Sequence, residues 1–274
     1  MTAEEVRRRC DYVRAADALE AALGAGLDPE SEPLRGVLEL DGGGQLLVMP
    51  SSAGGRAAVK LVTVGGDPRI QGICVVFDPV TLAPAAIVEA RALTELRTAA
   101  TSALAVRRLA PPDVRRLLVF GAGPQGRAHV EAISAVRPIE QVDVVDLGAG
   151  EVERRVAAAD VICCCTTARE PLFDGALVAD HATVVAIGSH EPDAREVDEA
   201  LVRRATIVVE SRASALREAG DVTIPLAAGV VAEADLVTLA ELVRGAAVAP
   251  DRPRFFKSTG MAWQDAVVAA VVVA

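Results

Sequence analysis

The chain has 274 residues and a formal net charge of −10 at pH 7. This acidic balance argues against nucleic acids and anionic membrane surfaces as partners, because both attract basic proteins. Hydrophobic residues make up 51% of the chain and aromatic residues only 3%, so a large core must be built from alanine, valine and leucine. The length suits one large domain or two modest ones.

The cysteines and histidines show no spacing typical of a metal site or of disulfide bonds. The five cysteines are an odd number without a C-x-x-C motif, and three of them are consecutive inside an apolar run. Residues 2–13 do not read as a signal segment, and the apolar run at 266–274 is far below the roughly 20 residues that span a bilayer. We therefore expect no metal, no membrane partner and a cytoplasmic location.

The first part of the chain is rich in predicted strands. A helix is expected over residues 3–23, and the strands are expected at 35–49 (two, around a turn at 41–44), 59–64, 72–77 and 85–90. A helix capped by Thr94 follows and ends before the prolines at 111 and 112. This order predicts an α+β domain over residues 1–110.

Strand and helix patterns alternate after the proline pair. The strands are expected at 117–120, 142–145, 161–165, 183–187 and 206–209, and the helices at 127–136, 151–159 and 196–203. Such alternation predicts a Rossmann-type, doubly wound parallel sheet over residues 111–253. Only 14 residues separate Asp146 from Val161, so the sheet is expected to be one strand short there. A last helix, within residues 254–274, is expected to complete the first domain.

Residues 117–127 read LLVFGAGPQGR, a strand that leads into a G-x-G-x-x-G turn and then a helix. In a dinucleotide-binding unit, Gly121 allows the turn, Gly123 lets the backbone approach a pyrophosphate, and Gly126 lets the helix pack on the strand. Asp146 follows Gly126 by 20 residues, where a carboxylate would bind the adenosine ribose and favour NAD over NADP. The alternatives are a glycine-rich turn without a ligand and an ordinary turn aspartate.

Three basic residues of the first domain, Arg35, Lys60 and Arg97, are candidates for binding an anion. Lys60 interrupts the apolar run AAVKLVTV, where its burial is costly unless it meets an anion. Arg97 falls in the first turn of the helix predicted from Thr94, where a cation opposes the helix dipole. The alternative for each is a surface cation whose aliphatic stem lies on the sheet.

Several segments together resemble the ornithine cyclodeaminase/μ-crystallin family over almost the whole chain. They are VMP (48–50), VKLVT (59–63), LTELRTAA (93–100), GAGPQG (121–126) and FKSTGMAWQDA (256–266). The resemblance implies a homodimer of two-domain subunits, in which the first domain binds substrate and dimerises and the Rossmann domain binds NAD(H) or NADP(H).

The resemblance also implies roles for individual residues. Arg35, Lys60 and Arg97 would hold the carboxylate of an amino or imino acid, and Lys60 would also supply charge or a proton. Pro124 and Gln125 would contact the pyrophosphate together with the glycines. The residues that would line the ribose and nicotinamide are Thr166, Val185, Ile187 and Ser258.

One departure from the family pattern bears on the reaction. Cyclodeaminases of the family carry an aspartate where this chain has His190, within GSHEP (188–192), which disfavours cyclodeamination unless Glu191 substitutes. His190 is either a proton donor, since histidine exchanges protons near neutral pH, or a loop residue without a catalytic role.

We therefore predict an NAD(P)H-dependent reductase of a small imino acid. Its substrate would be a cyclic ketimine such as pyrroline-2-carboxylate or an open-chain imine of a 2-oxo acid. One alternative is an amino acid dehydrogenase or an ornithine or lysine cyclodeaminase. Another is a non-catalytic, crystallin-like protein that keeps the dinucleotide site, which the shortened segment after Asp146 favours.

Overall fold

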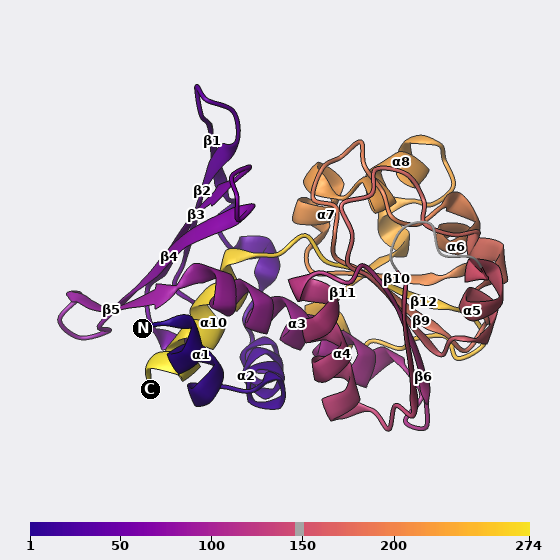
Figure 1. The fold of residues 1–274 in the computed structure, drawn as a ribbon, viewed down its shortest axis with the longest axis horizontal. Helices are drawn as coiled ribbons and strands as arrows, with labels where there is room; N and C mark the ends of the chain where they lie inside the picture. Colours follow the sequence, from indigo (N-terminus) through magenta and orange to yellow (C-terminus); the bar gives the residue numbers. More distant parts are fainter. Residues whose placement is uncertain (146–150) are drawn as a thin grey trace. The chain divides into compact units, whose positions relative to one another are not determined.

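The computed structural model describes residues 1–145 and 151–274. The chain forms two compact units, the first from residues 1–101 and 261–274 and the second from residues 102–260 (Figure 1). The division expected from the sequence, at residues 110 and 254 with a role for each domain, stays a prediction.

The first unit contains a five-stranded antiparallel sheet in the order β1-β2-β3-β4-β5. Each strand pairs with the next in sequence, as short turns between antiparallel strands allow. Helix α10 (Ala262–Val273) packs on β2, β3 and β4, and helices α1 and α2 also contact it. The bounds of the other elements are α1 Ala3–Arg9, α2 Tyr12–Gly24, η1 Pro29–Ser31, β1 Gly36–Glu39, β2 Gln45–Ser51, η2 Ala53–Gly55, β3 Ala58–Val64, β4 Ile70–Phe77, β5 Pro84–Glu89 and α3 Ala90–Leu109.

Two helix boundaries differ from the sequence-based expectation. The helix expected over residues 3–23 is broken, because the Asp11 side chain accepts a hydrogen bond from the Arg14 amide and starts α2 there. Helix α3 begins at Ala90, directly after β5, and not at Thr94. The Glu89 carboxylate accepts hydrogen bonds from the amides of Arg91 (3.2 Å) and Ala92 (2.7 Å) and so provides the N-terminal cap.

The second unit contains a seven-stranded sheet in the order β11-β10-β12-β9-β8-β6-β7. Every pairing in it is parallel, which confirms the predicted Rossmann-type sheet. The bounds are β6 Arg116–Phe120, α4 Pro124–Val136, β7 Gln141–Val145, α5 Val152–Ala158, β8 Val161–Cys164, η3 Gly175–Leu177, β9 Thr183–Ala186, α6 Glu199–Arg204, β10 Thr206–Val209, α7 Arg212–Glu218, α8 Gly220–Ala227, η4 Glu233–Asp235, β11 Leu236–Thr238, α9 Leu239–Val243 and β12 Arg254–Lys257.

The strand order places a ligand crevice at the carboxyl ends of β6 and β8. The chain goes from β6 to β7 on one side and resumes with β8 on the other side of β6, so the order reverses at this point. Ligands of open parallel sheets bind outside the strand ends at such a reversal. In the described part of the chain, β7 pairs with β6 alone and forms the edge of the sheet, which agrees with the short segment that follows it.

The cysteines of the second unit belong to its core. Cys163 and Cys164 lie in β8, with no exposed surface. Cys10, Cys74 and all three cysteines at 163–165 are free thiols. Among the described residues there is no group of three or more His, Cys, Asp or Glu side chains that could hold a metal ion, and no described helix has the length and apolar character needed to cross a membrane.

Candidate functional site

In the first unit, Lys60 and Arg97 meet on one carboxylate, that of Asp265. Lys60 lies in the middle of β3, on the face that α10 covers, and only 2% of its surface is exposed. Its Nζ donates to Asp265 Oδ1 at 2.8 Å and lies 2.7 Å from Oδ2. Arg97 Nε donates to the same Oδ1 at 3.0 Å, and Arg97 Nη1 donates to Gln264 Oε1 at 2.7 Å.

The surroundings of Lys60 are apolar, and this changes its acid–base behaviour. Met49 on β2 and Cys74 on β4 pair with Lys60 across the sheet, and both are buried. Burial lowers the pKa of Lys60 to about 8, the charge of Asp265 raises it, and the charges of Arg97 and Arg35 lower it further. Lys60 is therefore a cation near neutral pH that can give up its proton with little penalty.

Arg35 lies just before β1 and is half-buried, and its positive charge lowers the pKa of Lys60. Lys60 and Arg97 bring two positive charges to the single negative charge of Asp265. A further anion would be stabilised among them, and an arginine can bind a carboxylate with two hydrogen bonds.

The sequence-based argument for Arg97 was wrong in one respect. Because α3 begins at Ala90, Arg97 lies beyond the first turn and does not oppose the dipole at its N-terminus. The anion it meets is Asp265, on a helix more than 160 residues later in the chain. Sequence reasoning did not single out Asp265 or Gln264, although both lie inside the segment FKSTGMAWQDA.

In the second unit, the glycine turn has the shape that the fingerprint requires. Gly121 adopts φ +101°, and a Cβ there would overlap the carbonyl oxygen of Cys165. A Cβ on Gly126 would overlap the carbonyl oxygen of Gly121, so the close approach of α4 to β6 requires glycine. Gly123 is the N-cap of α4, followed by Pro124, and a Cβ there would meet nothing within 4 Å. The backbone at Gly123 is thus open to a ligand at a helix N-terminus.

The first turn of α4 contains a buried acceptor that lacks a donor. Within the described chain, Gln125 Oε1 is buried and has no hydrogen-bond partner. The Gln125 carbonyl oxygen is 2.7 Å from His129 Nδ1, and His129 Nε2 is 2.9 Å from Ser102 Oγ. Burial lowers the pKa of His129 to about 4, so this histidine is neutral and fixes the turn. The open backbone at Gly123 fits a bound dinucleotide, and the unpaired Gln125 oxygen is an acceptor that a hydroxyl or N–H donor would satisfy.

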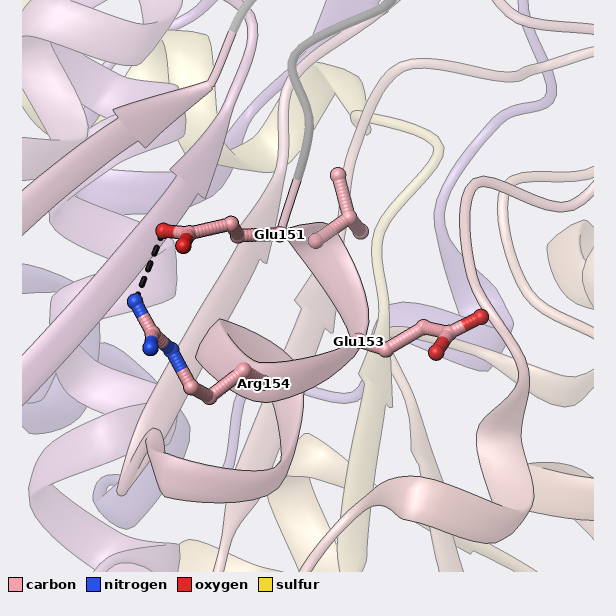
Figure 2. A pocket seen from close by; sticks show the side chains of 4 residues that line it. Glu151, Glu153 and Arg154 are labelled. Carbon is pink, nitrogen blue, oxygen red and sulfur yellow. Dashed lines mark hydrogen bonds and ion pairs between the residues drawn. The ribbon is translucent and has the colours of Figure 1, made fainter.

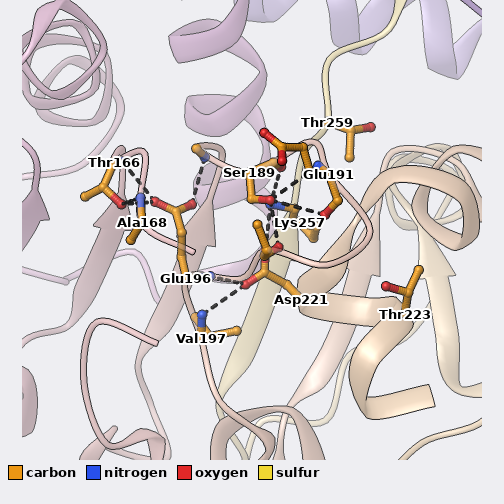
Figure 3. Close-up of polar contacts among 12 residues, drawn as sticks. Thr166, Ala168, Ser189, Glu191, Glu196, Val197, Asp221, Thr223, Lys257 and Thr259 are labelled. Carbon is orange, nitrogen blue, oxygen red and sulfur yellow. Dashed lines mark hydrogen bonds and ion pairs between the residues drawn. The ribbon is translucent and has the colours of Figure 1, made fainter. Parts of the chain in front are cut away.

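The other predicted cofactor residues gather at the carboxyl edge of the sheet. Thr166 follows β8, Ile187 follows β9 and Ser258 follows β12, whereas Val185 lies inside β9 and is fully buried. Ser258 Oγ donates to Glu210 Oε1 at 2.6 Å. Figure 3 shows buried charged side chains beneath this edge: Glu196, Asp221 and Lys257. Sequence reasoning did not select any of these three residues.

The two remaining predictions concern loops. His190 is half-buried in the loop after β9, and Glu191 beside it forms an ion pair with Arg169 at the surface. Asp146 lies outside the described residues, so its contact with a ribose stays a prediction. The described residues that follow it, 151–154, line a cavity of about 390 Å³ (Figure 2). Its arginine, Arg154, pairs with Glu151 at 2.7 Å, and Glu153 adds a second carboxylate, so this cavity does not suit a phosphate.

Comparisons with known proteins agree on one family. The sequence model of the ornithine cyclodeaminase/mu-crystallin family matches residues 1–150 and 147–274. The Delta(1)-pyrroline-2-carboxylate reductase of Paracoccus denitrificans (strain Pd 1222) is 36% identical over 232 residues, which are 76% of this chain and 73% of that protein. The ketimine reductase mu-crystallin of Mus musculus is 33% identical over 99% of this chain and 95% of its own.

A solved structure resembles the whole chain. It is Thermococcus litoralis Delta(1)-pyrroline-2-carboxylate reductase in complex with NADH and L-proline. The similarity has a TM-score of 0.91 at 27% identity and covers 100% of this chain and 95% of that one.

Proposed function

The chain belongs to the ornithine cyclodeaminase/mu-crystallin family, and we propose that it is an NAD(P)H-dependent reductase of a cyclic imino acid whose carboxylate is attached to the imine carbon. The observation that carries this proposal is the pair of buried cations, Lys60 and Arg97, that share Asp265. Two relatives with reductase names match most of the chain, and both names denote the reduction of a C=N bond.

The cofactor would be held by the second unit. The open backbone at Gly123 and the first turn of α4 would bind the pyrophosphate, to which the side-chain amide N–H of Gln125 would also donate. The residues after β8, β9 and β12 would line the nicotinamide. The bound cofactor supplies hydride. NAD(H) is favoured over NADP(H) by the predicted position of Asp146, and the similar Thermococcus litoralis structure contains NADH.

The substrate would be held by the first unit. Arg35, Lys60 and Arg97 would bind its carboxylate, which adds the negative charge that this cluster lacks. Lys60, whose pKa is lowered by burial to about 8, would give the imine nitrogen the proton that accompanies hydride addition. Reduction of Δ1-pyrroline-2-carboxylate in this way yields proline, and L-proline is the second ligand of the similar solved structure.

The native form would be a homodimer. The face of the antiparallel sheet opposite α10, here called the outer face, is apolar and partly exposed. It consists of Leu38, Leu46, Val48, Val59, Leu61, Ile73, Val75 and Ile87. A soluble protein rarely leaves such a face uncovered, and a second copy of the chain would bury it. A cytoplasmic location also stays a prediction.

The decisive experiment is an assay of NADH and NADPH oxidation with Δ1-pyrroline-2-carboxylate and its six-membered homologue. Δ1-Pyrroline-5-carboxylate is the matched control, because its carboxylate is not on the imine carbon. We expect oxidation with the two 2-carboxylates and little with the control. Absence of oxidation with both, together with ammonia release from ornithine or lysine, would instead establish a cyclodeaminase. Cofactor binding without any turnover would establish a non-catalytic member.

A further inference from the structure

A network of buried charges connects the carboxyl ends of three neighbouring strands, β8, β9 and β12 (Figure 3). Its central residue is Glu196, in the segment between β9 and α6, which has no exposed surface. Glu196 Oε1 accepts hydrogen bonds from Thr166 N (2.9 Å) and Thr166 Oγ1 (2.8 Å), on the loop after β8. Glu196 Oε2 accepts one from Gly188 N (2.7 Å), on the loop after β9. One carboxylate therefore ties two loops together.

The backbone at Gly188 shows how close this contact is. A Cβ on Gly188 would overlap the carbonyl oxygen of Thr166 and the carboxylate of Glu196. The two loops and the carboxylate are thus in direct contact, and a displacement of Glu196 must move at least one loop. Burial and the charge of Asp221 raise the pKa of Glu196, while the charge of Lys257 and the backbone donors of Thr166 and Gly188 act in the opposite sense.

A second layer holds Glu196 in place. Asp221 Oδ1 accepts hydrogen bonds from the backbone amides of Glu196 (2.7 Å) and Val197 (2.9 Å). Lys257 Nζ lies 2.7 Å from Asp221 Oδ2 and donates to the carbonyl oxygen of Ser189 at 2.7 Å. Lys257 is the last residue of β12 and immediately precedes Ser258, so the network also reaches the third strand end.

A network of buried charges is not needed to stabilise a protein core. Well-packed apolar residues of similar size often stabilise a protein as much as a buried ion pair does. What a fully bonded polar network adds is a single arrangement of the groups it connects. Here those groups are the loops after β8 and β9, on the side of β6 away from β7. In a dinucleotide-binding sheet the adenosine half lies toward β7, so these loops face the nicotinamide half.

We propose that Glu196 is a positioning residue for the nicotinamide half of the cofactor site, and that it acts through its hydrogen bonds to the loops at Thr166 and Gly188. This inference rests on the proposed use of NAD(P)H. It separates two parts of cofactor binding. The glycine turn would determine the affinity for the ADP-ribose part, and Glu196 would determine the additional affinity contributed by the nicotinamide ring.

The test compares NADH with ADP-ribose, which lacks the nicotinamide ring, by titration of the full-length protein. The variant is Glu196→Gln, whose amide nitrogen would face a backbone donor at one of the two loops. The matched control is Glu199→Gln, three residues later on α6, whose carboxylate pairs with Arg195 and is partly exposed. In Glu196→Gln we expect the NADH dissociation constant to rise about tenfold, as for a lost charge-assisted hydrogen bond. ADP-ribose should bind as in the wild type.

A second variant tests the same contact in case Glu196→Gln does not fold. Thr166→Val is nearly isosteric and removes a hydroxyl that donates to Glu196 Oε1 and accepts from the Ala168 amide at 3.1 Å. NADH should weaken at least about threefold, as for a lost hydrogen bond, with ADP-ribose unaffected. Equal weakening of both ligands, or unchanged NADH binding in both folded variants, would overturn the positioning role. A wild-type protein that binds neither of these ligands nor NADPH would instead overturn the proposed cofactor use, and this inference with it.

Discussion

Asp265 is the residue on which the acid–base behaviour of the candidate substrate site depends. Its charge is the influence that keeps Lys60 protonated against burial and against the neighbouring arginines. Cys74, which faces Lys60 from β4, stays a neutral thiol in the same range, because burial raises its pKa to about 12. Of the two side chains that pair directly across β3 and β4 here, Lys60 is therefore the one that titrates near neutral pH.

The pH dependence of the reductase should report Lys60 directly. The pKa of Lys60 is lowered from 10.5 to about 8, so its cationic form predominates below pH 8 and is lost above it. In the proposed mechanism that cation binds the carboxylate and provides the proton, so kcat/KM for the imino acid should fall as the pH rises through 8. In Asp265→Asn the charge that raises the pKa of Lys60 is gone, so the fall should move to lower pH.

Lys60→Arg is the control for this pH profile. Arginine stays protonated throughout the accessible range, so the fall near pH 8 should disappear even if the rate itself decreases. A profile that keeps the same alkaline fall in both Asp265→Asn and Lys60→Arg would assign it to another group.

At the scale of the elements, the turn between β6 and α4 contains glycines with two different roles. Gly126 is required for packing, since a Cβ there overlaps the Gly121 carbonyl, whereas Gly123 has open space and an ordinary backbone conformation. Gly126→Ala should therefore lower both the midpoint of thermal unfolding and the affinity for ADP-ribose. Gly123→Ala should leave the unfolding midpoint within about a degree of the wild type, as for an open surface position, while it weakens ADP-ribose at least about tenfold. Thermal melts and calorimetric titrations would measure both, and a Gly123→Ala protein with normal ADP-ribose affinity would contradict the assignment of the pyrophosphate site.

Elements that follow from a local sequence pattern could be predicted from the sequence. Elements whose bounds depend on contacts with other parts of the chain could not. The parallel sheet and the glycine turn follow from strand and helix periods and from a short motif. The start of α3 did not follow, because Glu89 caps it from the preceding strand. Strand β12 was missed as well, because its two apolar residues lie between Arg254 and Lys257, and both charges are satisfied only in the folded chain.

The candidate site shows the same limit. A lysine inside an apolar run indicated that Lys60 either meets an anion or shifts toward neutrality. Periodicity could not identify Asp265, the carboxylate that it contacts in the folded chain. The partnership exists only because α10 returns to the sheet of the first unit. In the same way, Glu196 and Asp221 have the composition of ordinary loop and helix acids, and only the approach of neighbouring strand ends buries them.

At the scale of the whole molecule, the outer face of the antiparallel sheet predicts assembly. Ile73 and Ile87 are 40% and 54% exposed on this face. Ile73 pairs with Leu61 on β3 and with Glu89 on β5, and Ile87 pairs with Val75 on β4. Transfer of such side chains out of water is the main source of association energy, about 25 cal/mol for each Å² of apolar surface. A glutamate there would have to be buried without a partner, which a stable interface does not tolerate.

Ile87→Glu and Ile73→Glu should each convert the proposed dimer into monomers. Val80→Glu is the matched control, because Val80 is 88% exposed in the loop between β4 and β5 rather than on the sheet. Sedimentation velocity over a range of protein concentrations would measure the distribution of species, with ADP-ribose binding as a check that the second unit is intact. Dissociation in the two sheet variants but not in Val80→Glu would place the interface on the outer face. A wild-type protein that sediments as a monomer at all concentrations would refute the dimer, and sheet variants that remain dimeric would move its interface elsewhere.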